Sequence, residues 1–417
     1  MSDFISMRIQ RKELQIQAAT REAVRKRAHG LVSQVPARGV LPYYTSRRDY
    51  LYQFVFPDGE HCTPLISDFA NKIHGGNVVA IGDEDGRVSL IRTDKKNSQE
   101  DSDFHHTFYC HRHGVSDVKW SQDDTMLLTA SYDRLVKLWD VETRKCLASF
   151  PEHEDLVRSA NWHPINPYSI VSSSKDGSFR IYDMRCNQKD SEEENDVVIY
   201  DPIVKVPNAH HLKTKPTSSS EMGQTIRSVT CALFSGIDDT KVITSGSTDG
   251  AIKLWDARKG SSPKTLESTV FKSENGVPRG ITDMKIDHSG SRLFSVCMDN
   301  SVYMHYLVNL TKPAEKYKDP DFEVNSFDAK LSVSPGGEFI MTGSSHQSIF
   351  VWETGRETKT ANEAAYVFEA HSKRVSSVAW HKSTMYQFAS CSEDFTTRIW
   401  HFDRTCMQDP DNRIHQL

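Results

Sequence analysis

Histidine and aspartate residues recur along the chain in an order that could serve catalysis. Three histidines are each followed by an aspartate: His113, His153 and His371 precede Asp133, Asp176 and Asp394. A histidine held by a carboxylate acts as the base in hydrolytic triads. Such chemistry also needs a nucleophile or a cofactor-binding loop, and the sequence has no GxSxG, HExxH or GxxxxGK[ST] motif. We therefore expect a protein that is not an enzyme.

A second cluster contains residue types that bind zinc. Cys110, His111 and His113 lie close together, with His105 and His106 upstream. Structural zinc sites usually combine such ligands with a second pair, commonly CxxC. The eight cysteines include no CxxC pair, and the repeat described next gives His113 another role. We therefore expect no metal and no cofactor.

The histidines and aspartates belong to a repeating unit. Each copy has an alternating apolar run, a short turn that contains an aspartate in most copies, a second alternating run and a closing residue that is usually aromatic. The clearest copy is LLTASYDRLVKLWD at 127–140, and the others lie at 170–183, 242–256, 293–306, 339–353, 388–401 and, less distinctly, 78–91. Alternation places every second side chain on one face, so each run predicts a half-buried strand and each turn a hairpin.

Further strands complete each unit. Ahead of most copies lies another short alternating run, as in VSDVKW at 115–120, VRSANW at 157–162, ITDMKI at 281–286 and VSSVAW at 375–380. Four-stranded units that recur about every 40 to 50 residues are the signature of a WD-repeat propeller. The sequence therefore predicts an all-β, seven-bladed WD-repeat β-propeller. The last unit lacks an outer strand, and we expect YLYQFVF at 50–56 to pair with it, because an open ring would leave strand edges unpaired.

This fold gives the recurring polar residues a structural role. A buried histidine bonded to the turn aspartate, with Ser or Thr and a tryptophan indole, would satisfy polar groups between blades. We favour this network over a catalytic His–Asp pair. Its predicted members are His113, Asp133, Trp139, His153, Asp176, Asp249, His371, Asp394 and Trp400.

Composition excludes several kinds of partner. The 417 residues carry a net charge of −5, whereas residues 1–40 hold eight basic and three acidic residues, so the rest of the chain is acidic. Nucleic-acid-binding surfaces are usually basic, and we expect no direct nucleic-acid binding. No apolar stretch approaches the roughly 20 residues of a membrane-spanning helix, so we expect no membrane contact.

Three segments lie outside the repeat. Residues 1–40 include a long run without Pro or Gly, which predicts a basic helical arm ahead of the propeller at 41–402. An insertion at 186–225, between blades 3 and 4, is acidic and then rich in Lys, Pro and Ser, which predicts a partly disordered surface loop suited to a partner or modification site. Residues 403–417 predict a short tail.

Particular strings resemble the denticleless family. They are GVLPYY at 39–44, YDMRCNQKD at 182–190, KLWDARK at 253–259, DHSGSRLFSVCMDNSVYMHYLVNLTK at 287–312 and LSVSPGGEFIMTGSS at 331–345. Denticleless proteins are substrate receptors of cullin-4 RING ubiquitin ligases. The resemblance therefore implies a non-catalytic nuclear receptor that binds the damaged-DNA-binding adaptor. It would present replication or cell-cycle proteins, such as the replication-licensing factor, for ubiquitination and degradation.

The resemblance also implies which residues bind the adaptor. Such receptors use a W-D-x-R string at the end of a blade. Trp255, Asp256 and Arg258 match it fully, while Asp183 and Arg185 match it with a tyrosine in place of the tryptophan. The planar, five-donor arginine side chain suits such an interface. Without the resemblance, a solvated strand end would be the preferred interpretation of either arginine.

Departures from the family pattern limit this interpretation. The blade that ends at Asp140 has Glu142 in place of the arginine, so we expect no contribution from it. Residues 403–417 contain no clamp-binding box, so we expect any dependence on the DNA sliding clamp on chromatin to come through the target. The alternative, from a different class, is a non-catalytic WD-repeat scaffold in another nuclear complex, for RNA processing or chromatin.

Overall fold

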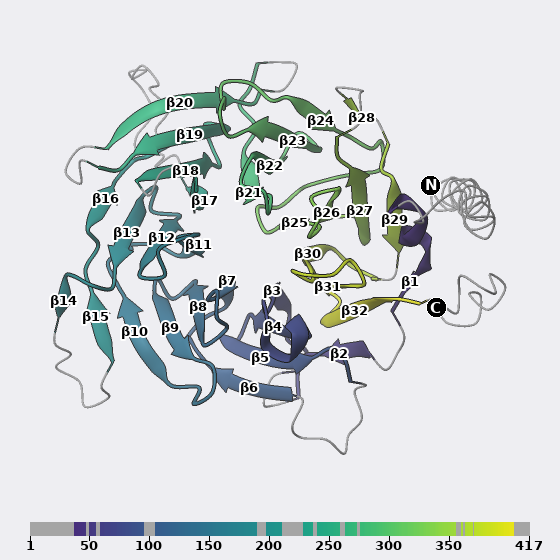
Figure 1. Ribbon diagram of the computed structural model, residues 1–417, viewed down its shortest axis with the longest axis horizontal. Helices are drawn as coiled ribbons and strands as arrows, with labels where there is room; N and C mark the ends of the chain where they lie inside the picture. Colours follow the sequence, from purple (N-terminus) through teal and green to yellow (C-terminus); the bar gives the residue numbers. More distant parts are fainter. Residues whose placement is uncertain are drawn as a thin grey trace.

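Seven β-sheets are arranged in a ring (Figure 1), and their inner strands line a central channel. The computed structural model describes residues 37–403, apart from 47–49, 56–58, 96–104, 190–196, 211–227, 237–239, 259–262, 273–275, 356–359, 362 and 370. The prediction of a seven-bladed β-propeller is confirmed. The helix predicted within residues 1–40 and most of the tail at 403–417 lie outside the described residues.

The first four blades each begin with the strand nearest the channel. Blade 1 consists of β3 (Pro64–Phe69), β4 (Val78–Asp83), β5 (Arg87–Arg92) and β6 (His105–Tyr109), with the short 3-10 helix η3 (Ile73–Gly76) after β3. Blade 2 consists of β7 (Val115–Trp120), β8 (Met126–Ser131), β9 (Val136–Asp140) and β10 (Cys146–Phe150). Blade 3 consists of β11 (Val157–Trp162), β12 (Ser169–Ser174), β13 (Phe179–Asp183) and β16 (Val204–Val206). Blade 4 consists of β17 (Val229–Phe234), β18 (Lys241–Gly246), β19 (Ala251–Asp256) and β20 (Lys264–Val270).

The remaining three blades follow the same order. Blade 5 consists of β21 (Ile281–Ile286), β22 (Arg292–Cys297), β23 (Ser301–Tyr306) and β24 (Glu315–Tyr317). Blade 6 consists of β25 (Leu331–Val333), β26 (Phe339–Gly343), β27 (Ser348–Glu353) and β29 (Tyr366–Glu369). Blade 7 consists of β30 (Val375–Trp380), β31 (Gln387–Ser392) and β32 (Thr396–Phe402), together with the amino-terminal strands β1 (Tyr44–Thr45) and β2 (Leu51–Gln53).

The amino-terminal strands close the ring. β2 runs antiparallel to β32, with Leu51 opposite Arg398, and β1 continues along the same strand, with Tyr44 opposite Phe402. The predicted pairing of this segment with the last blade is therefore confirmed for Leu51–Gln53. The 3-10 helix η1 (Ala37–Tyr43) leads into β1 and buries Leu41 completely.

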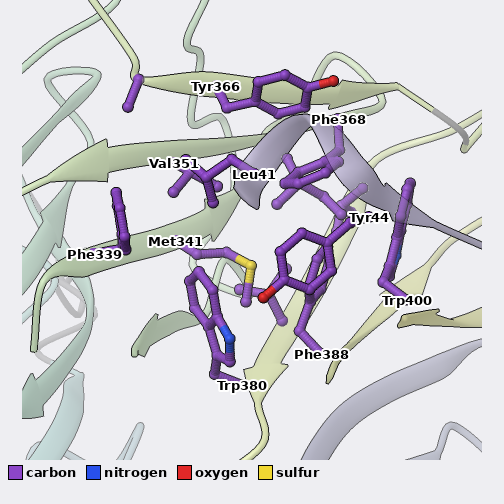
Figure 2. Packing of buried hydrophobic residues seen from close by; sticks show 14 residues of the cluster. Leu41, Tyr44, Phe339, Met341, Val351, Tyr366, Phe368, Trp380, Phe388 and Trp400 are labelled. Atoms are coloured by element: carbon purple, nitrogen blue, oxygen red, sulfur yellow. The ribbon is translucent and has the colours of Figure 1, made fainter. Parts of the chain in front are cut away.

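A dense aromatic cluster fixes this junction (Figure 2). The ring of Tyr44 lies edge-on to Phe368 of blade 6, with 5.9 Å between ring centroids, and is tilted against Phe388 of blade 7 at 5.2 Å. Fully burying a side chain of this size contributes about 1.5 to 3 kcal/mol. The junction thus joins the amino terminus to two blades that are distant in sequence.

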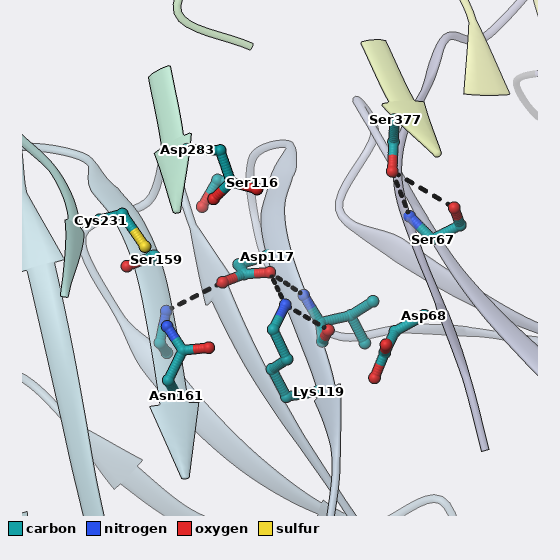
Figure 3. A network of polar contacts seen from close by, with 12 residues as sticks. Ser67, Asp68, Ser116, Asp117, Lys119, Ser159, Asn161, Cys231, Asp283 and Ser377 are labelled. Carbon is teal, nitrogen blue, oxygen red and sulfur yellow. Dashed lines mark hydrogen bonds and ion pairs between the residues drawn. The ribbon is translucent and has the colours of Figure 1, made fainter. Parts of the chain in front are cut away.

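Neighbouring inner strands are joined by side chains rather than by strand pairing. Oxygens near the middle of one inner strand accept hydrogen bonds from main-chain N–H groups of the next (Figure 3). The bonds are Ala160 N–Asp117 Oδ2 at 3.2 Å, Ala232 N–Ser159 Oγ at 3.2 Å, Leu331 N–Asp283 Oδ2 at 3.0 Å and Ser67 N–Ser377 Oγ at 3.1 Å. They satisfy main-chain donors that would otherwise be unpaired at the inner edge of each sheet.

Four blades contain the histidine network. In each copy a histidine makes two hydrogen bonds of 2.7 to 2.9 Å. Its Nδ1 is bonded to the turn aspartate and its Nε2 to a Ser or Thr hydroxyl. The four sets are His111–Asp133–Thr129, His153–Asp176–Ser172, His210–Asp249–Thr244 and His371–Asp394–Ser390. In blades 2, 4 and 7 the same hydroxyl also accepts the indole N–H of Trp139, Trp255 or Trp400.

The prediction for His113 is wrong. His111 occupies the network position in blade 2, and its Nδ1 lies 2.9 Å from Asp133. His113 is exposed and contributes its main-chain oxygen to the hydroxyl of Ser131. His210 was missed because it lies inside the 186–225 insertion rather than directly before its blade.

The insertion also differs from the predicted surface loop. Within its described part, β14 (Gln188–Lys189) and β15 (Val198–Tyr200) extend blade 2, and β15 pairs parallel with β10. β16 then supplies the fourth strand of blade 3. The segment that breaks the sequence repeat therefore covers one sheet edge and completes another. A similar addition occurs in blade 5, where β28 (Thr360–Ala361) pairs parallel with β24.

Blade 5 lacks the histidine network. By strand register Lys272 is equivalent to His111, and His305 replaces the closing tryptophan. Neither ring nitrogen of His305 has a hydrogen-bond partner among the described residues, and burial lowers its pKa to about 4. An unpartnered buried imidazole costs stability.

Replacing His111 with alanine tests the corrected network position. His111→Ala leaves Asp133 and Thr129 buried without their partner, so we expect the free energy of unfolding to fall by about 2 to 4 kcal/mol. His113→Ala is the matched control and should change it by less than about 0.5 kcal/mol. Urea denaturation measures both. Equal effects, or a larger effect of His113→Ala, would show that the network is assigned to the wrong histidine.

The network also makes stability depend on pH. Burial lowers the pKa of His111, His153, His210 and His371, so these imidazoles stay neutral while unfolded histidines take up protons below about pH 6.5. Burial alone would raise the pKa of Asp133, but hydrogen bonds from His111 and main-chain N–H groups bring it to about 2. Both shifts mean that the unfolded state binds more protons, so stability falls on acidification.

We expect the melting temperature to fall steadily as the pH is lowered from 7.5 to 5, and further below pH 4 as carboxylates protonate. Differential scanning calorimetry at constant ionic strength measures this dependence. A melting temperature that rises or stays constant from pH 7.5 to 5 would contradict the neutral, buried state of the four histidines.

Candidate functional site

Two arginines follow the third strands of adjacent blades. Arg185 comes two residues after the end of β13 and Arg258 two residues after the end of β19. Each folds back onto the aspartate that ends its strand. Arg185 Nε and Nη2 donate to Asp183 at 2.9 and 2.6 Å, and Arg258 Nε donates to Asp256 at 2.9 Å while its Nη2 donates to the same carboxylate. We call these two Arg–Asp pairs the forks.

The two forks lie on the same face of the propeller. The turn before Arg185 is bonded to the connection between the first and second strands of its blade, through Met184 N and Tyr168 O at 2.9 Å. The turn before Arg258 is bonded in the same way, through Ala257 N and Thr240 O at 2.8 Å. Equivalent connections of neighbouring blades lie on one side of the ring. We call the side that carries the forks, together with Tyr168 and Thr240 to which their turns are bonded, the fork face.

The forks hold exposed cations in fixed positions. The Arg185 side chain is 59% exposed and that of Arg258 is 65% exposed, whereas their aspartates are largely covered. The hydrogen bond from Arg185 lowers the pKa of Asp183, and that from Arg258 lowers the pKa of Asp256 to about 2. Both carboxylates are therefore ionised at neutral pH. A side chain that is already ordered loses less entropy when a partner binds it.

Tyr168 supports one fork from the side. The guanidinium carbon of Arg185 lies 5.7 Å from the centre of the Tyr168 ring, within the range of a cation–π contact. This tyrosine belongs to the connection between β12 and β11 and is itself half-exposed. Arg185 is thus held between a carboxylate and an aromatic ring.

Trp255 has a different role from the one predicted for it. Its side chain is only 7% exposed, its indole N–H donates to Thr244 at 2.8 Å, and its ring packs on Phe179 of blade 3. It therefore positions the strand that carries Asp256 and does not itself reach a partner on the surface. In blade 3 the corresponding Tyr182 is fully buried and donates its hydroxyl to Pro151 O at 2.9 Å.

The next blade presents apolar side chains at the same positions. When blade 5 is aligned on blade 4, Tyr306 stands in place of Asp256 and Val308 in place of Arg258. Val308 is 85% exposed, and Tyr306 and the blade 3 residue Ile165 are exposed as well. A search for arginine in a W-D-x-R string misses these residues, although alignment of the repeats on their turns would have found them.

Blade 2 has no fork, as Glu142 led us to expect. Its strand-end carboxylate, Asp140, accepts hydrogen bonds from the main chain and hydroxyl of Thr143 at 2.6 Å. Among the described residues, blades 3 and 4 present arginines that are more than half exposed in such a D-x-R pair.

Metal ligands and membrane-spanning helices are two other features that the described part of the chain could contain. No group of three or more His, Cys, Asp or Glu side chains there could hold a metal ion. His111 of the predicted metal-like cluster is bonded to Asp133 and Thr129. No helix within those residues is long and apolar enough to cross a membrane.

Comparisons with known proteins agree with this architecture. The WD domain, G-beta repeat family matches residues 102–140, 144–183, 222–256 and 362–401. The chain is 30% identical over 341 residues to "Denticleless protein homolog" of Danio rerio, an alignment that covers 79% of this chain and 50% of that protein. It is 26% identical to "Denticleless protein homolog" of Homo sapiens, with 92% of this chain and 52% of that protein covered.

A fungal relative is similar to the same extent. "Cell division cycle protein cdt2" of Schizosaccharomyces pombe (strain 972 / ATCC 24843) is 26% identical, with 81% of this chain and 68% of that protein covered. The chain spans about half the length of the vertebrate relatives it matches. These similarities extend over most of the propeller, and the chain belongs to the denticleless family of WD-repeat proteins.

Proposed function

We propose that this chain is a substrate-recognition subunit of a cullin-4 RING ubiquitin ligase. It binds the damaged-DNA-binding adaptor of the ligase through the fork face and presents replication or cell-cycle proteins, such as the licensing factor, on another surface. It acts in the nucleus and is itself non-catalytic. Membership of the denticleless family supports this class of function.

The pair of forks is the observation that carries the proposal. Two exposed guanidinium groups on adjacent blades are each held by an ionised aspartate, so their outward donors have defined directions. Arginine is enriched among the residues that dominate binding energy at protein interfaces. It satisfies a carboxylate or carbonyl through several parallel donors. The geometry therefore suits a partner with acceptor groups facing blades 3 and 4.

Apolar residues around the forks extend this surface. Tyr168 and Ile165 flank the blade 3 fork, while Tyr306 and Val308 occupy the equivalent positions in blade 5. Protein interfaces combine such apolar and aromatic contacts with a few arginine anchors. Exposed side chains of this kind are costly to leave in water, and covering them would favour docking.

The double variant Arg185→Ala, Arg258→Ala tests the proposal. We expect adaptor affinity to fall at least a hundredfold, because each truncation removes an interface anchor that typically contributes about 2 kcal/mol. Surface plasmon resonance with purified adaptor measures the affinity. The matched control is Arg112→Ala, Arg134→Ala, which removes two exposed arginines from loops on the opposite face and should leave affinity unchanged.

Two outcomes would count against the assignment. Equal affinity of the fork variant and the control, with both folded, would remove the forks from the interface. Failure of the unmodified chain to bind the adaptor would remove the ligase function and favour the alternative WD-repeat scaffold.

Val308→Glu tests whether the interface reaches blade 5. Because Val308 is 85% exposed, the substitution should leave stability unchanged, while a carboxylate in an apolar contact should weaken adaptor binding about tenfold. Tyr109→Glu, at an exposed position in blade 1, is the control. Unchanged adaptor affinity of Val308→Glu would limit the interface to blades 3 and 4.

A further inference from the structure

The central channel opens into a cavity on the fork face. The cavity has a volume of about 830 Å³ and is bounded by the distal ends of the inner strands. Its lining includes Pro164 and Gly236, which lie in the same strand connections that hold the turns of Arg185 and Arg258. The cavity and the forks therefore face the same side of the propeller.

The lining of this cavity contains more lysines than carboxylates. Four lysines from four blades line it: Lys119 on β7, Lys285 on β21, Lys330 directly before β25 and Lys382 after β30. Asp68 and Asp287 are the carboxylates among the lining residues, and Asp287 is already bonded to Arg292 at 2.9 Å. Low-dielectric walls concentrate the field of such charges.

Two of the lysines have carboxylate partners and two do not. Lys119 is bonded to Asp117, and Lys382 Nζ lies 2.9 Å from Asp68 (Figure 3 shows Asp117, Lys119 and Asp68). No hydrogen bond or close ion pair joins the ammonium group of Lys285 or Lys330 to another side chain in the described part of the chain. Each ammonium group has three donors, and both lysines line the cavity.

Both lysines nevertheless stay charged. Burial opposes the charge on Lys285, but Asp283 and Asp117 outweigh it and raise its pKa, and the same two carboxylates raise the pKa of Lys330. Asp283 is directed toward its neighbouring blade, since its Oδ2 accepts from Leu331 N at 3.0 Å. The two carboxylates thus stabilise the charge on both ammonium groups without accepting hydrogen bonds from them.

The other end of the channel is crossed by ion pairs. Arg158 of blade 3 bonds to Asp328 of blade 6 at 3.3 Å, and Arg374 of blade 7 lies 3.7 Å from the same carboxylate and pairs with Glu393. These residues come from the starts of the inner strands, opposite the fork face. A ligand would therefore reach Lys285 and Lys330 from the fork face.

We propose that the open end of the channel is an oxyanion site in which Lys285 and Lys330, with Lys119 beside them, bind one phosphate or carboxylate group. Ammonium groups act as compact point charges toward such oxyanions and form strong, charge-assisted hydrogen bonds. The group has two sources: free phosphate in solution, or an acidic side chain of the protein docked on the fork face. The second source rests on the proposed function.

The test compares three forms of the full chain. They are the unmodified chain, the double variant Lys285→Gln, Lys330→Gln, and a charge-matched control, Lys175→Gln, Lys373→Gln, which alters loops on the opposite face. Titration calorimetry with inorganic phosphate forms one arm, and adaptor affinity forms the other. If free phosphate is the ligand, the double variant binds phosphate at least tenfold more weakly than the other two forms.

If an acidic side chain is the ligand, phosphate does not bind measurably. In that case the double variant instead binds the adaptor at least tenfold more weakly than the control. Equal behaviour of the double variant and the control in both arms overturns the oxyanion site and leaves the proposed function intact. If the unmodified chain does not bind the adaptor, the proposed function fails and the phosphate arm alone decides the site.

Loss of two cations beside Asp283 could lower stability, so melting temperatures accompany each measurement. Should the double variant be unfolded, Lys285→Gln and Lys330→Gln are tested singly, each retaining one ammonium group beside that carboxylate. We expect about a tenfold loss from either one. Unchanged binding by both folded single variants overturns the proposal.

Discussion

The structure depends on pairing the main-chain groups at the edges of its sheets. Seven separate sheets present many edges, and an unpaired edge exposes donors and acceptors that invite misassembly. Blade 7 obtains its outer strands from the amino terminus, where Leu51 pairs with Arg398. At the channel, side chains such as Asp117 and Ser159 accept the N–H groups of the next blade. The ring is closed because main-chain groups are paired both at the outer edge of blade 7 and at the inner edges beside the channel.

A rigid ring determines where functional side chains lie. Every blade repeats the same path, so residues at the same repeat position lie on the same face, as Arg185 and Arg258 do. Side chains that occupy those positions without serving the fold are free to differ, and blade 5 has Val308 where blade 4 has an arginine. The fork face thus combines cations, aromatic rings and apolar groups on one scaffold. A repeated scaffold with variable surface side chains is typical of repeat proteins that act as binding platforms.

Local periodicity was sufficient to predict the blades and the strand that closes the ring, whereas Arg185 and Arg258 were singled out by the family resemblance. It failed where the role of a residue depends on contacts with residues distant in sequence. His113 was preferred over His111 because spacing alone cannot distinguish two histidines that lie close together, whereas burial beside Asp133 can. The 186–225 insertion was interpreted as a loop, since its short strands β15 and β16 acquire their stability from strands of blades 2 and 3. The channel lysines were missed because they converge from four blades.

We propose that the fork face is the surface on which the ligase adaptor docks. A cryo-electron microscopy structure of the chain with the damaged-DNA-binding adaptor would show the interface itself. We expect the guanidinium groups of Arg185 and Arg258 to be buried in it, with the mouth of the channel facing the adaptor. An adaptor bound to the opposite face, or to the outer edges of the blades with both arginines exposed, would contradict it.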